Sequence, residues 1–98
     1  MIKHFDISDF VQTRTIKSVM TDLVKRIVMR RKESKISQTK LSALSGVSFA
    51  SIRRFEKIGE ISLTSLIKIA NALGYIEDFD LLFKTEKIVN LKDYGNDK

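Results

Sequence analysis

Apolar residues recur at intervals of three and four along much of this chain, which is the spacing of a helix that buries one face. The first such run lies within residues 19–32 and consists of Leu23, Val24, Ile27 and Val28. We therefore expect a first helix over residues 19–32.

Three later segments share a pattern that starts helices. Ser37, Ser48 and Ser62 each follow an apolar residue and precede another by four positions. A serine in this position accepts a hydrogen bond from an N-terminal amide, and the two apolar residues pack together as a hydrophobic staple. The pattern predicts helices that begin at about Gln38, near Phe49 and at about Leu63.

Glycines provide the expected helix ends, because the chain contains four glycines and no proline. A residue without a β-carbon adopts the left-handed conformation of a helix C-terminus, so we expect helices over residues 38–44 and 63–73 to end at Gly46 and Gly74. Phe79, Leu82 and Phe83 have the spacing of a short fifth helix. The sequence KIVNL, residues 87–91, is compatible with a short strand.

These elements predict one all-α domain. The chain has 98 residues, of which 43% are hydrophobic, enough for one core. We expect an N-terminal extension over residues 1–18, the five-helix domain over residues 19–84, and a C-terminal tail over residues 85–98 that supplies a dimerisation strand if KIVNL is extended.

Positive charge is concentrated in one part of the chain. The formal net charge is +6, and residues 11–60 carry twelve basic and four acidic side chains. Such a concentration suits a polyanion, since Lys and Arg release counterions when they neutralise phosphates. Charge by itself does not distinguish DNA, RNA or anionic lipid.

The chain lacks the residues that several classes of function require. With no cysteine and His4 as the single histidine, the chain has too few ligands for zinc, and it has neither a glycine-rich phosphate loop nor a spaced catalytic constellation. We expect no enzyme activity and no cofactor. The sequence also lacks a membrane-spanning stretch and a secretory signal, so we expect a cytoplasmic protein. It has no aromatic platform of the kind that proteins use to bind single-stranded RNA, which favours duplex DNA over RNA.

Two short helices joined by the tight turn of residues 44–48 form a helix-turn-helix unit, whose second helix can enter a major groove. The stretches SQTKLSALSGVSFASIRRFEKIG and SLTSLIKIANALG resemble the Cro and lambda-type repressors, the XRE family, over about residues 20–83. The resemblance implies a lambda-repressor-like fold that binds duplex DNA. Ser42 stands where the family usually has alanine, and Lys57-Ile58-Gly59 is one residue longer than the common turn.

The helix that begins near Phe49 contains the expected base contacts. On a helical wheel Ile52 and Phe55 point to the core, while Ala50, Arg54 and Lys57 lie near the opposite face. Arg54 is the leading base reader, because a guanidinium makes paired hydrogen bonds to guanine.

The resemblance assigns further roles to residues of the same unit. It places Phe49 and Ala50 at base-facing positions, where they can touch thymine methyl groups, although Phe49 lies near the edge of the core face and is nearly as well suited to packing. It makes Arg31 and Glu56 a structural ion pair. The side chains suited to phosphate contacts are Gln38, Thr39, Ser48, Ser51, Arg53 and Lys57.

We expect a homodimer that represses transcription on a pseudo-palindromic operator and is nucleoid-associated when bound, because one short recognition helix reads few base pairs. Activation uses the same module and stays open. An alternative comes from SIRRFEKIGEISLTSLIKIANALGYIEDFDLLF, which resembles HipB-type antitoxins. Such proteins repress their own operon and also bind a HipA-like kinase toxin.

Overall fold

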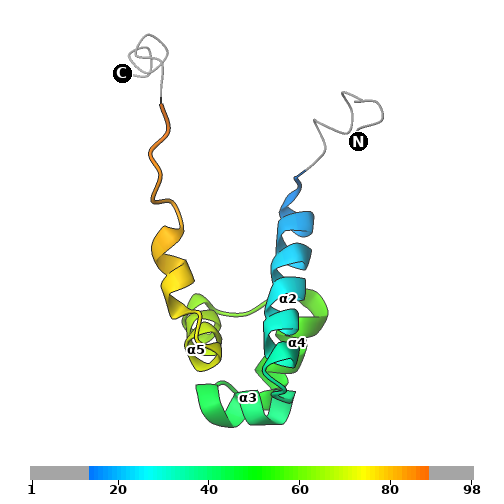
Figure 1. Ribbon diagram of the computed structural model, residues 1–98. Helices are drawn as coiled ribbons and strands as arrows, with labels where there is room; N and C mark the ends of the chain where they lie inside the picture. The colour runs from blue at the N-terminus through cyan, green and yellow to red at the C-terminus, as the bar shows by residue number, and fades with distance from the viewer. Residues whose placement is uncertain (1–13, 89–98) are drawn as a thin grey trace.

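The structure is a computed structural model that describes residues 14–88. Helices account for all the regular structure in this range, which confirms the predicted all-α fold. Figure 1 shows α2 beside α4, α3 across their lower ends, and α5 with η1 on the opposite side. The elements in chain order are α2 (Ile16–Glu33), α3 (Gln38–Ser45), α4 (Phe49–Ile58), α5 (Leu63–Leu73) and the 3-10 helix η1 (Ile76–Leu81).

The predicted serine caps are confirmed at the start of α3, α4 and α5. The hydroxyls of Ser37, Ser48 and Ser62 accept hydrogen bonds from the backbone N–H groups three residues further on, at 3.0, 3.1 and 3.1 Å. Each bond satisfies one of the amides that a helix leaves without an internal partner. Local sequence therefore determines where these three helices begin.

Replacement of Ser62 by alanine tests the contribution of such a cap at a site away from α4. Ser62→Ala is expected to lower the free energy of unfolding by about 1 kcal/mol, because the amide of Ser65 loses its partner. Urea denaturation measures this change. Thr64→Ala is the control in the same exposed first turn and should leave stability unchanged or slightly higher; an equal loss in both variants would contradict the capping role.

The first helix begins three residues earlier than expected, at Ile16 instead of Val19. Thr15 and Ser18 form a reciprocal cap in which each backbone N–H donates to the other hydroxyl at 3.0 Å. The interval of apolar residues did not indicate this start, because Ile16 is 84% exposed and belongs to no buried face. The helix thus extends into the segment expected to precede the domain.

The expected fifth helix is only partly correct. It is a 3-10 helix that ends at Leu81, and Phe83 lies beyond it, fully exposed and with a φ of +58°. Of the three aromatic and aliphatic residues that predicted it, only Phe79 is half-buried. A pattern of five residues is too short to separate an α-helical turn from a 3-10 turn.

The predicted strand over residues 87–91 receives no support from its described part. Lys87 and Ile88 have no regular structure, and the remaining three residues lie outside the described range. None of the helices between Ile16 and Leu81 is both long and apolar enough to cross a membrane.

The core lies where α3, α4 and α5 meet, and α2 closes it on one side. Leu41, Ile52 and Ile69 are fully buried, and Val47 of the turn between α3 and α4 joins them. Ile52 and Phe55 both point inward, in agreement with the helical wheel. The opposite face of α4 is therefore directed to the surface.

Two glycines allow the chain to reverse around α4. Gly46 ends α3 with a φ of +79°, and Gly59 ends α4 with a φ of +81°, a conformation that side chains with a β-carbon disfavour. A β-carbon at Gly59 would lie 3.3 Å from Cε of Met20. Gly59 therefore also permits the close approach of the end of α4 to α2.

Candidate nucleic-acid interface

The turn between α3 and α4 sets the angle at which α4 is presented. The hydroxyl of Ser42 donates to the carbonyl of Val47 at 2.6 Å, and the N–H of Val47 donates to the hydroxyl of Ser45 at 3.1 Å. Val47 itself is buried in the core. Ser42, which replaces the alanine usual in the resembling family, thus braces the turn by bonding its backbone.

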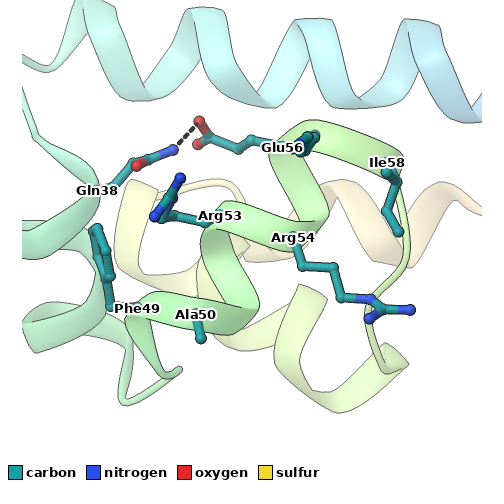
Figure 2. A pocket seen from close by; sticks show the side chains of 8 residues that line it. Gln38, Phe49, Ala50, Arg53, Arg54, Glu56 and Ile58 are labelled. Atoms are coloured by element: carbon teal, nitrogen blue, oxygen red, sulfur yellow. Dashed lines mark hydrogen bonds between the residues drawn. The ribbon is translucent and has the colours of Figure 1, made fainter.

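The outer face of α4 borders a concave surface that encloses a volume of about 890 Å³. Figure 2 shows Arg53 and Arg54 extending from α4 in different directions, with Phe49 and Ala50 near its start and Gln38 approaching from α3. The surface brings together six of the nine side chains predicted to contact DNA; Thr39, Ser48 and Ser51 are not among them. Its lining is Gln38, Phe49, Ala50, Arg53, Arg54, Glu56, Lys57 and Ile58.

Arg31 of α2 and Glu56 of α4 form a bidentate ion pair at the edge of this surface, whose lining includes Glu56. Nε of Arg31 donates to Oε2 of Glu56 at 2.7 Å, and Nη2 donates to Oε1 at 2.9 Å. Nη1 of the same guanidinium donates to the carbonyl of Ile36 at 2.9 Å. Both charged side chains are only 10% exposed, so the pair holds α2, the loop after it and α4 in one arrangement.

Gln38 belongs to the same network. Its Nε2 donates to Oε1 of Glu56 at 2.8 Å, a contact drawn as the dashed line in Figure 2. The contact ties the first residue of α3 to α4 and leaves the second amide hydrogen of Gln38 available. The carboxamide is therefore held in a fixed orientation before any ligand arrives.

Phe49 has two predicted roles, contact with thymine and packing in the core, and the structure does not place it in the core. Its side chain is 43% exposed, and the guanidinium carbon of Arg53 lies 5.8 Å from the centre of its ring. A cation over an aromatic face at this distance is attracted by the ring quadrupole. Phe49 thus restricts where Arg53 points on the surface of α4.

Arg54, the leading candidate for base reading, is paired with Glu60, a residue without a predicted role. Its Nη2 donates to Oε1 of Glu60 at 2.6 Å, and the two side chains are 63% and 59% exposed. Glu60 lies six residues further on, past Gly59, so the helical rule for pairs three or four apart does not indicate it. The acidic residue reduces the positive charge at one end of the concave surface.

Three of the remaining candidates lie near helix starts. Ser48 caps α4, and its hydroxyl donates to that of Ser51 at 2.9 Å, while Thr39 is exposed in the first turn of α3. Lys57 is exposed in the last turn of α4. The amides at a helix N-terminus attract anions, so Ser48 and Ser51 lie where a phosphate is favoured.

Comparison with known proteins identifies the same region. A family model described as helix-turn-helix matches residues 27–79, more than half of the chain, from the second half of α2 into η1. No curated protein and no solved structure matches the chain. The match includes α3, the turn and α4 in full.

Proposed function

This chain belongs to the helix-turn-helix family of XRE type, and on that premise we propose that it is a sequence-specific repressor that binds duplex DNA as a homodimer. One observation carries the proposal. α4 buries Ile52 and Phe55 against the core while Arg53, Arg54 and Lys57 of the same helix are exposed. This is the arrangement that a helix needs to enter a major groove with basic side chains leading.

Base reading would rest on the outer face of α4. Arg54 exchanges Glu60 for the O6 and N7 atoms of a guanine, which accept two parallel hydrogen bonds from one guanidinium. Ala50 and the exposed ring of Phe49 contact thymine methyl groups. An exposed ion pair of this kind contributes little in water, so its loss is readily offset by the contact with guanine.

Phosphate contacts would fix the register of the helix in the groove. Arg53 is directed by Phe49 and Gln38 is held by Glu56, so both side chains lose little conformational freedom on binding. The contacts position the protein on the duplex without reading its sequence. The set proposed for this role is Gln38, Thr39, Ser48, Ser51, Arg53 and Lys57.

Two copies would bind successive major grooves. A dimer of α4 helices reads two half-sites about 34–36 Å apart, one turn of B-DNA, and the operator is then a pseudo-palindrome. A protein seated across a promoter in this way excludes RNA polymerase, which is the basis of repression.

Selection from a pool of random duplexes tests this function directly. The chain should enrich a two-fold symmetric motif with half-sites about 10 base pairs apart, and its affinity should fall steeply as salt rises. Lys68→Ala, which removes one exposed charge from α5, is the control and should select the same motif. Weak binding to all sequences alike, abolished by salt, would contradict sequence-specific repression.

Glu60 provides a second test, because its carboxylate competes with DNA for Arg54. Glu60→Gln should raise affinity several-fold and raise it more for unrelated duplexes than for the selected motif, since a released Arg54 reaches any phosphate. Titration of each protein with the selected motif and with an unrelated duplex measures the ratio of the two affinities. Glu33→Gln makes the same charge change at an exposed pair on α2 and should alter neither affinity appreciably; equal effects of the two variants would refute a specific role for Glu60.

The antitoxin alternative keeps the same DNA contacts and adds a protein partner. It is favoured by the likeness of residues 51–83, which comprise α4 from its third residue, α5 and η1, to HipB-type proteins. If a neighbouring gene encodes a HipA-like kinase, co-expression of the two proteins tests this alternative. A stable complex that still binds the selected motif would support the antitoxin role, whereas separate elution of the two proteins would oppose it.

A further inference from the structure

A second concave surface, of about 370 Å³, lies between α2 on one side and α5 with η1 on the other. It shares no lining residue with the surface beside α4. In Figure 1, α2 stands on one side and α5 with η1 on the other, with α3 below them. Its apolar lining includes Leu23, Ile27, Leu66, Leu73, Phe79 and Leu82.

Positive charge lies along one wall of this groove. Arg26 and Arg30 of α2 line it, with Asp78 as the acidic residue of the lining. Nη2 of Arg30 pairs with Glu33, yet the Nε of Arg30 is buried without a hydrogen-bond partner among the described residues. The guanidinium groups of Arg26 and Arg30 therefore outnumber the single carboxylate of the lining. The groove thus suits an apolar segment that also carries a carboxylate.

We propose that residues 1–13 of the same chain dock in this groove. The segment reads MIKHFDISDFVQT and places Phe5, Ile7 and Phe10 beside two acidic residues, Asp6 and Asp9. Its aromatic and aliphatic side chains match the apolar walls, and its carboxylates match the two arginines. Burial of this apolar area against the exposed lining stabilises the docked form.

The length of the segment and its point of attachment agree with this placement. It joins the described chain just before α2, which is itself one wall of the groove. The helix rises about 16 Å from Ile16 to Ile27, whereas thirteen residues span about 20 Å as a helix and about 40 Å when extended. The segment is therefore long enough to fold back along α2 in either conformation.

The other terminal segment is a poorer match for the groove. Residues 89–98, VNLKDYGNDK, contain three apolar side chains, two lysines and two aspartates, whereas residues 1–13 contain six apolar side chains, one lysine and two aspartates. The side chains of residues 1–13 have one more acidic than basic group, whereas those of residues 89–98 balance. Apolar content is the main reason to favour residues 1–13, and the net acidic charge agrees with the wall that carries Arg26 and Arg30.

Paramagnetic broadening tests the proposal on the full chain. The protein has no cysteine, so Ser8→Cys accepts a single nitroxide label, and methyl signals of Leu66 and Leu73 report on the groove. The label should remove much of the intensity of the Leu66 and Leu73 methyl signals. The methyl signal of Ala50 on α4 should keep its intensity. Groove signals that retain full intensity, or loss confined to other parts of the surface, would overturn the proposal.

Two further samples identify what holds the segment and which copy supplies it. Adding Phe5→Ser and Phe10→Ser to the labelled chain should restore the groove signals, with those of Ile52 and Ile69 showing that the core is unchanged. Persistent broadening would show that apolar docking is not the cause. In a mixture of isotope-labelled chains with separate spin-labelled chains, equal broadening would mean that the segment of a second copy fills the groove, which would also overturn docking within one chain.

Discussion

Glu56→Ala is expected to lower the free energy of unfolding by about 3–5 kcal/mol, because it leaves the guanidinium of Arg31 buried without its counter-charge. The change also removes the acceptor that orients Gln38. Urea denaturation followed by circular dichroism measures the loss. DNA binding should weaken along with it, since α4 is held to α2 and α3 through this carboxylate.

The control for this variant is an ion pair of the same chemistry at the surface. Glu33→Ala removes the partner of Arg30, and Glu33 is largely exposed, so the expected loss is below about 1 kcal/mol. A combined Arg31→Met and Glu56→Leu variant should be more stable than Glu56→Ala, because it leaves no unpaired charge behind. Equal losses in Glu56→Ala and Glu33→Ala would show that the buried pair has no special structural role.

Arg54→Ala is expected to have the second large effect, which is a loss of DNA recognition and not of stability. Loss of a bidentate contact with guanine costs about 1–3 kcal/mol, or roughly 5–150-fold in affinity. Because the side chain is largely exposed, the free energy of unfolding should hardly change. Repeating the selection from random duplexes should show one position of each half-site relaxed.

Lys57→Ala is the matched comparison on the same helix face. A residue that contacts phosphate should weaken binding to all duplexes about equally and reduce the slope of affinity against salt by about one. The two variants thus separate base reading from charge. If Arg54→Ala also weakens all sequences alike and leaves the motif intact, Arg54 is a phosphate contact and another side chain reads the base.

Local sequence was sufficient for the helix starts and ends that depend on neighbouring residues. A serine cap forms within three residues, as at Ser48, and a left-handed helix end needs a glycine at one position, as at Gly46. The same reasoning failed for the start of α2 and for η1. Ile16 is exposed and Phe83 lies outside any helix, so neither belongs to the buried face that regular apolar spacing predicts.

Short-range bonds and helical periodicity are enough to predict the all-α class, the three serine-capped helices, the buried face of α4 and the basic face opposite it. The partners of the polar side chains depend instead on how distant segments pack together. Gln38 bonds to Glu56 and Arg54 to Glu60 because α3 crosses α4 and the chain reverses at Gly59. The groove between α2 and α5 arises in the same way, from helices distant in sequence whose separation no local pattern encodes.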